Sequence, residues 1–248
     1  MASIGIFDSG SGGLSVLREI RKILPDERYI YYSDNAYCPY GEKTPEFVTA
    51  RSRAVTDILL SKGCSAVVVA CNTATAAAIS TLRASYEIPF VGMEPAVKPA
   101  ASGTRSGVVG VLATAGTLKA TKYRSTKEQY ADAVRIEERV GRGFVELVEN
   151  LDLDSPGAES VVRASLQPLL DAGADTIVLG CTHYPFLLPL MRRITSPDVH
   201  FIDPAPAVAR RLADVLGMYG IPLTDDSPGV ELLSSGPDNT LKKLFKLI

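Results

Sequence analysis

The chain has 248 residues, of which 46% are hydrophobic and 22% charged, a composition typical of a globular protein with two modest cores or one large one. Its net charge of −2 and pI near 5.8 give no electrostatic reason to expect nucleic acid or an anionic membrane surface as a partner. No basic segment precedes an apolar one near the N-terminus, and no apolar run reaches about 18 residues, so we expect a cytoplasmic protein without a membrane span.

The first predicted elements are a strand, a glycine-rich turn and a helix. Residues 4–7 form an apolar run, Asp8-Ser9-Gly10-Ser11-Gly12-Gly13 follows, and apolar residues then recur at helical spacing over 14–24. Such a turn exposes backbone N–H groups at a helix N-terminus, where a carboxylate or phosphate can bind. The turn lacks the P-loop lysine and the full dinucleotide-binding spacing, so it indicates a nucleotide only weakly. Asp8 either caps the turn or acts on a neighbouring proton.

Strands and helices then alternate along the chain. The loop at 34–41 follows a strand, which is where α/β proteins place binding residues, so Tyr40 either contacts a ligand or simply packs there. The predicted strands lie at 28–33, 65–70 and 89–92, and the predicted helices at 46–60 and 73–86.

Three segments of this first part recur later at nearly constant offsets of 105 (109 − 4), 110 (181 − 71) and 109 (203 − 94). Repeated segments in the same order and at similar offsets indicate two similar α/β halves. Each half should be an open parallel sheet that binds ligands beyond the carboxyl ends of its strands, in a cleft between the halves. The matching pairs are residues 4–12 with 109–117, residues 65–73 with 175–183, and Glu94 with Asp203.

We therefore predict two α/β domains related by pseudo-symmetry. The first comprises residues 1–97 and 207–248, and the second residues 98–206. Two predicted helices in the C-terminal tail are too short for a third domain, so the tail should return to pack on the first half. These helices lie at 207–218 and 238–248.

The cysteines raise the question of which thiols react. Four cysteines and two histidines lack the paired spacing of zinc sites, so we expect free thiols and no metal. A buried structural role is usual for cysteine, and we assign it to Cys38 and Cys64. Cys71 and Cys181 instead recur at the equivalent strand end in both halves, which favours two thiols facing one site. His183 follows Cys181 closely enough to hold a proton near it or to shift its pKa.

Two equivalent thiols on opposite sides of a cleft suit the inversion of a carbon centre. A base on one face removes a proton, an acid on the other face returns one, and the two exchange roles in the reverse direction. A free thiol, with a pKa of about 8.5, is closer than a carboxyl, at about 4.3, to what a weakly acidic C–H requires. A charge or helix N-terminus could lower the thiol's pKa by roughly 1.5 units. Asp8 and His183 are candidate proton acceptors. The candidate donors to developing charge are Ser9, Asn72, Thr73, Thr114 and Thr182.

Four motifs together resemble the glutamate racemases of the aspartate/glutamate racemase superfamily, and the resemblance covers about residues 4–206. It implies a racemase without a cofactor that converts L-glutamate to D-glutamate for peptidoglycan synthesis in cell-wall biogenesis. It also implies two α/β domains and a homodimer. The motifs are Asp8-Ser9-Gly10-Ser11-Gly12-Gly13-Leu14, Pro39-Tyr40-Gly41, Cys71-Asn72-Thr73-Ala74 and Gly180-Cys181-Thr182-His183-Tyr184-Pro185.

The resemblance also assigns roles by position. Cys71 and Cys181 become the acid/base pair, assisted by Asp8, His183 and Glu149, although Glu146 competes with Glu149 for its role. The residues expected to bind the amino acid are Ser9, Tyr40, Gly41, Asn72, Thr73, Thr114, Thr117 and Thr182.

Other functions remain open at this point. Aspartate is one methylene shorter than glutamate, a difference that a pocket typically discriminates by only about 1 to 3 kcal/mol. His183 and the extent of the match favour glutamate. From other classes, the two cysteines could form a redox disulfide or act as nucleophiles, or the cleft could merely bind an amino acid.

Overall fold

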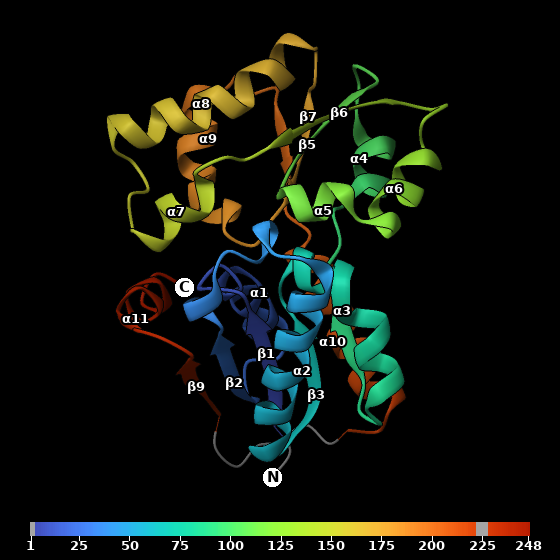
Figure 1. The fold of residues 1–248 in the computed structure, drawn as a ribbon. Coiled ribbons are helices and arrows are strands. Elements are labelled where there is room, and N and C mark those ends of the chain that lie inside the picture. Colours follow the sequence, from blue (N-terminus) through green and yellow to red (C-terminus); the bar gives the residue numbers. More distant parts are fainter. Residues whose placement is uncertain (1–2, 222–227) are drawn as a thin grey trace.

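The computed structural model describes residues 3–221 and 228–248, which form an α/β fold with two separate parallel sheets (Figure 1). The first sheet has the strand order β4-β3-β1-β2-β9 and the second β6-β5-β7-β8, and every strand pair is parallel. The first sheet contains β1 (Ser3–Asp8), β2 (Arg28–Ser33), β3 (Cys64–Val69), β4 (Phe90–Gly92) and β9 (Gly229–Ser234). The second contains β5 (Val108–Ala113), β6 (Arg135–Val140), β7 (Thr176–Gly180) and β8 (His200–Ile202).

Helices cover both faces of each sheet, which explains why the central strands are apolar along their whole length. In the first half α1 packs against α10 and α2 against α3; in the second, α4 and α8 pack on opposite faces of β5. Alternate residues of β1 face different cores, Ile6 toward α1 and Phe7 toward α2 and α3. The helices are α1 (Leu14–Ile23), α2 (Pro45–Ser61), α3 (Asn72–Ser85), α4 (Val97–Gly103), α5 (Ala115–Lys119), α6 (Thr121–Glu128), α7 (Phe144–Glu149), α8 (Pro156–Asp171), α9 (Leu188–Ile194), α10 (Ala205–Met218) and α11 (Asn239–Phe245).

The two halves share one topology. The order β4-β3-β1-β2 in the first sheet corresponds to β8-β7-β5-β6 in the second, with β1 and β5 at equivalent central places. This confirms the fold class expected from the internal repeat. It also places the carboxyl ends of β1, β3, β5 and β7 toward the junction of the two lobes, where Figure 1 shows the loops of the two halves meeting.

The C-terminal tail adds a strand that the sequence analysis missed. After α10, which packs on α1 and β4, β9 pairs with β2 at the edge of the first sheet, and the predicted terminal helix is present as α11. The boundaries at 97/98 and 206/207 stay a prediction.

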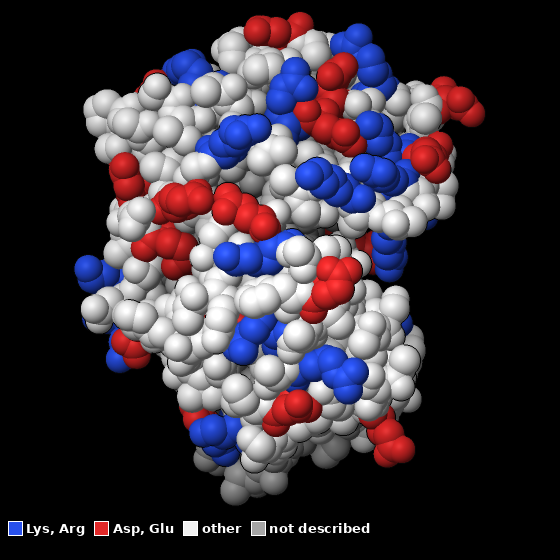
Figure 2. Space-filling model, viewed as in Figure 1, with Lys and Arg blue, Asp and Glu red and all other residues white. Residues whose placement is uncertain are grey.

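On the face shown in Figure 2, Lys and Arg side chains are interspersed with Asp and Glu over both lobes. Among residues 3–221 and 228–248, no helix is both long and apolar enough to cross a bilayer.

Candidate active site

The first thiol stands between β3 and α3. Cys71 is the N-cap residue of α3, and its Sγ accepts a hydrogen bond from the N–H of Ala74 at 3.4 Å. The residue is only 5% exposed, and its Sγ lies 3.9 Å from the hydroxyl oxygen of Ser9. Burial and the nearby charge of Asp8 raise the pKa of the Cys71 thiol well above its usual value. The lowering of the pKa expected from a helix N-terminus is therefore outweighed by burial and by Asp8.

Asp8, the last residue of β1, is fully buried beside this thiol. Its Oδ2 accepts hydrogen bonds from the N–H of Gly13 at 2.7 Å and from the hydroxyl of Thr182 at 3.1 Å. Burial raises the pKa of Asp8, although the charge of His183 and the N–H of Gly13 oppose the rise. Since Thr182 belongs to the second half, Asp8 joins the two halves as well as facing the first thiol.

A histidine and a carboxylate lie beside the second thiol. Cys181, 7% exposed, follows β7, and its Sγ lies 3.7 Å from His183 Nδ1. The other ring nitrogen, Nε2, lies 2.7 Å from Glu149 Oε1. Burial opposes a charged His183, yet hydrogen bonds with Cys181, Cys38 and Glu149 outweigh burial and raise its pKa well above its usual value. His183 therefore lies between the Cys181 thiol and the Glu149 carboxylate, with one ring nitrogen near each.

Glu149, at the end of α7, is the carboxylate that contacts His183. Its Oε1 accepts from the N–H of Ser11 at 2.6 Å and its Oε2 from the Ser11 hydroxyl at 3.1 Å. Although burial opposes ionisation, His183 and Ser11 lower the pKa of Glu149. Glu146, the alternative left open by the sequence, lies on the exposed surface of the same short helix.

The glycine-rich turn binds the protein's own carboxylates. The N–H groups of Ser11 and Gly13, which the sequence analysis offered to an external anion, donate to Glu149 and Asp8. Glycine is required here by close approach, because a Cβ on Gly12 would lie only 2.3 Å from His183 Nδ1. The turn thus holds the carboxylates of Asp8 and Glu149 in place.

A cluster of hydroxyl groups joins α3 of the first half to the start of α5 in the second half. The hydroxyl oxygen of Thr73 lies 2.9 Å from that of Thr114 and 3.4 Å from that of Thr117. Gly41 packs so closely on Thr114 that an added Cβ would lie 2.7 Å from the threonine Cβ. The neighbouring amide of Asn72 is buried, and neither its nitrogen nor its oxygen has a hydrogen-bond partner among the described residues.

Tyr40 contacts a charged pair that the sequence analysis missed. Its hydroxyl donates to the Asp34 carboxylate, which also accepts two hydrogen bonds of 2.9 Å from Arg51. The Asp34 side chain is 0% exposed and that of Arg51 22%. Because its hydroxyl is engaged, Tyr40 is placed to hold the loop that carries Gly41 rather than to donate to a ligand.

Replacing Arg51 with methionine should lower the free energy of unfolding by about 3 kcal/mol, because it leaves a buried carboxylate without its cation. Chemical denaturation measures the loss. Arg53→Met, on the exposed side of the same helix, is the control and should change stability little. Equal stability of the two variants would show that the Asp34 pair contributes nothing.

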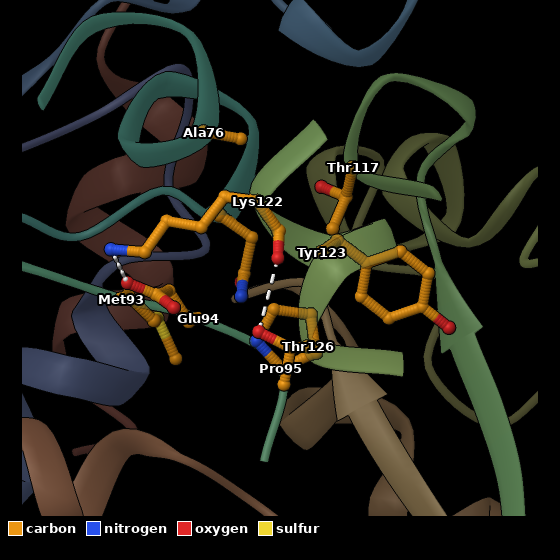
Figure 3. A pocket seen from close by; sticks show the side chains of 9 residues that line it. Ala76, Met93, Glu94, Pro95, Thr117, Lys122, Tyr123 and Thr126 are labelled. Carbon is orange, nitrogen blue, oxygen red and sulfur yellow. Dashed lines mark hydrogen bonds and ion pairs between the residues drawn. The ribbon is translucent and has the colours of Figure 1, made fainter. Parts of the chain in front are cut away.

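Two cavities adjoin the hydroxyl cluster, and neither is lined by Cys71 or Cys181. A groove of about 790 Å³ runs between α2, α3 and α5, past Gly41 and Thr73. A cavity of about 20 Å³, near the size of one water molecule, is lined by Asn72 and Thr117 and lies beside the ion pair of Lys122 with Glu94 at 2.5 Å (Figure 3). The larger groove therefore adjoins the hydroxyl cluster but not the two sulfurs.

Comparison with known proteins now adds to this geometry. The family model described as Asp/Glu/Hydantoin racemase matches residues 4–212. The chain belongs to this racemase family. Among curated members, the glutamate racemase of Ectopseudomonas mendocina is 46% identical over 248 residues, which span all of this chain and 94% of that protein. The glutamate racemase of Methylococcus capsulatus is 50% identical over 235 residues, or 94% of this chain and 87% of that protein.

Solved structures of the racemase family have the same fold. Glutamate racemase of Escherichia coli, in complex with L-glutamate and an activator, is 34% identical with a TM-score of 0.88, covering 100% of this chain and 95% of that one. A Bacillus anthracis glutamate racemase is 32% identical with a TM-score of 0.88, covering 99% of this chain and 93% of that one. An aspartate racemase homologue from Pyrococcus horikoshii, at 20% identity and a TM-score of 0.53 over 88% of this chain and all of that one, shares the fold alone.

The structure brings most of the predicted site residues of this racemase-family chain together. Asp8, Cys71, Cys181, His183 and Glu149 form one connected group, and Thr182 joins it through Asp8. Ser9 lies beside Cys71, and Thr73, Thr114 and Thr117 form the hydroxyl cluster with Gly41. Cys38, assigned a structural role from the sequence, also lies against His183 and Glu149.

Proposed function

We propose that this protein interconverts L- and D-glutamate without a cofactor, with Cys71 and Cys181 as the two bases. The observation that carries the proposal is the pairing of two buried thiols from the two halves, each with its own proton-holding group, Asp8 and His183. The two thiols are close enough for Cys181 to act on the pKa of Cys71 electrostatically. Glutamate as the substrate is supported by relatives of 46–50% identity that are named glutamate racemases.

In the proposed reaction one cysteine, as a thiolate, removes the α-proton from one face of the amino acid. The electron pair left on the α-carbon is delocalised toward the α-carboxylate, and the opposite thiol delivers its proton to the other face. One proton leaves the substrate and one arrives, so the configuration inverts and the two sulfurs exchange protonation states. Asp8 and His183 reset these states by accepting or returning a proton.

The hydroxyl cluster and the neighbouring polar groups would bind the amino acid. The amide of Asn72 is buried without a partner, which costs free energy that a polar group of the ligand can recover. Hydroxyl donors beside the reacting carbon also stabilise the charge that develops there. The proposed contacts are Ser9, Tyr40, Gly41, Asn72, Thr73, Thr114, Thr117 and Thr182, with Tyr40 acting through its position.

The proposal also includes the metabolic role, the compartment and the oligomeric state of the protein. D-glutamate made in the cytoplasm would supply peptidoglycan synthesis, and the protein would act as a homodimer, whose mass light scattering measures. The alternatives are an aspartate racemase and, from another class, a thiol-redox or thiol-nucleophile enzyme. The similarity favours glutamate, and a redox pair should form a disulfide under mild oxidation whereas the proposed reaction needs free thiols.

The purified protein, with no pyridoxal phosphate added, should bring the optical rotation of L-glutamate to zero. In D2O the α-proton should exchange for deuterium as the rotation falls, because each inversion draws a proton from a thiol that equilibrates with solvent. NMR follows the exchange and polarimetry the inversion.

L-aspartate run in parallel is the comparison. Faster racemisation of aspartate would replace the proposed substrate. Activity that appears only with added pyridoxal phosphate would contradict the two-thiol reaction.

A further inference from the structure

The fold brings together three potential metal ligands that the sequence spacing does not suggest. The donor atoms of Cys38, Glu149 and His183 all lie within 4.8 Å of one another. They come from three separate places: the loop after β2, the end of α7 and the segment after β7. Because no two of them are neighbours in the sequence, a search for paired zinc motifs overlooks them.

The three donor atoms converge over a glycine. A Cβ built on Gly10 would lie 2.3 Å from Glu149 Oε1, 3.0 Å from Cys38 Sγ and 3.1 Å from His183 Nε2. The absence of a side chain at Gly10 therefore allows the three groups to approach one another. Cys38 and Glu149 are partly exposed, the Glu149 side chain at 20%, so an ion can reach the group from solvent.

We propose that this group, Cys38 with Glu149 and His183, is a binding site for a thiophilic divalent cation, with Zn²⁺ as the best match, and that the bound ion inhibits the enzyme. A thiolate, an imidazole and a carboxylate are all common zinc ligands, and three protein ligands leave a fourth position for water.

Binding requires only a small movement. His183 Nε2 and Glu149 Oε1 are 2.7 Å apart, whereas two ligands of a tetrahedral zinc ion are about 3.3 Å apart at the usual bond lengths. The ion takes the place of the proton shared by this pair, and Cys38 binds it as a thiolate, so that shared proton and the Cys38 thiol proton both leave to solvent. His183 then carries its remaining proton on Nδ1, facing Cys181 Sγ.

Inhibition follows from the same contacts and rests on the proposed function. An ion bound to Nε2 and to Glu149 prevents His183 from passing a proton between Cys181 and its carboxylate partner. The cation thus acts on the enzyme without contacting either of the proposed catalytic thiols.

The test compares Cys38→Ser with wild type, after removal of metal by a chelator. Co²⁺ replaces Zn²⁺ as an optical probe, since a cobalt–thiolate bond gives a charge-transfer band. Wild type should bind one equivalent of Co²⁺ with this band, and Cys38→Ser should lose it. Half-inhibition of glutamate racemisation by Zn²⁺ should need at least about tenfold more metal in Cys38→Ser, because a ligand is lost.

Cys64→Ser is the matched control, since Cys64 is a buried thiol at the start of β3, away from the site. Cys64→Ser should bind and respond to metal like wild type and should keep wild-type activity without metal. The zinc response of Cys38→Ser is measured relative to its own rate without metal, because Cys38 contacts His183. A cobalt–thiolate band or zinc sensitivity unchanged in Cys38→Ser would overturn the proposal by placing the metal on other thiols. Absence of the band from wild type would also overturn it. A protein that binds Co²⁺ through Cys38 but does not racemise glutamate would refute only the proposed function.

Discussion

Replacing Cys71 or Cys181 with serine is expected to lower the rate of glutamate racemisation by about a thousandfold in each case. Serine keeps the size of the side chain, but its hydroxyl is a much weaker acid than a thiol and a poor base at neutral pH. Both sulfurs are buried against protein groups, so no water molecule or neighbouring residue takes over the same position on the same face of the substrate.

Proton exchange distinguishes the two thiols. With one sulfur removed, the other can still take the α-proton of one enantiomer and return a deuteron to the same face. Each single variant should therefore exchange the α-proton of a different enantiomer in D2O without inverting it. Cys64→Ser, the control, should racemise at the wild-type rate. Full exchange and inversion in either active-site variant would refute the assignment of that cysteine.

Asp8→Asn and His183→Asn should each reduce kcat by about a hundredfold, because each removes the group that holds the proton of one thiol. The asparagine at position 8 can still accept from Gly13 and Thr182, so its effect arises from charge rather than from lost packing. In wild type Asp8 acts on Cys71, and His183 lies beside Cys181. The two variants should therefore impair opposite proton transfers.

Isotope effects measure this asymmetry. The values of kcat/KM do not reveal it, because the equilibrium constant between two enantiomers is one and kcat/KM must therefore be equal in both directions. Glutamate deuterated at the α-carbon should show a larger isotope effect for one enantiomer in Asp8→Asn and for the other enantiomer in His183→Asn. A structural disturbance alone would slow the reaction in both directions, and the enantiomer with the larger isotope effect would not differ between the two variants. The same enantiomer affected in both variants would contradict the division of roles.

The sequence predicts the architecture well where strands are central. The buried runs of β1, β3, β5 and β7 are apolar because helices cover both of their faces, and their recurrence reveals the repeat. Two of the edge strands, β6 and β9, are missed for the opposite reason. β6 has the sequence Arg-Ile-Glu-Glu-Arg-Val and is only partly buried, so it carries no apolar run to detect.

Some residues of the candidate active site also cannot be identified from the sequence alone. Glu146 and Glu149 are three residues apart on one short helix, so their spacing cannot distinguish them; only the packing of α7 against the second half and the turn at Ser11 does. The Asp34–Arg51 pair joins a loop to α2, and Cys38 meets His183 across 145 residues (183 − 38). Such contacts depend on the tertiary packing of the chain, which no local sequence pattern predicts.

The bonds between the halves have a consequence for the timing of the reaction. Ser11 with Glu149, Asp8 with Thr182, and Thr73 with Thr114 each join a residue of one half to a residue of the other. Any separation of the halves must therefore break these bonds. Asp8 and Glu149 keep these contacts only while the two halves stay together, so the proton carriers are complete only in that arrangement. Proton transfer in the proposed reaction is thus tied to the contact between the halves, which also limits the access of water to a carbanion.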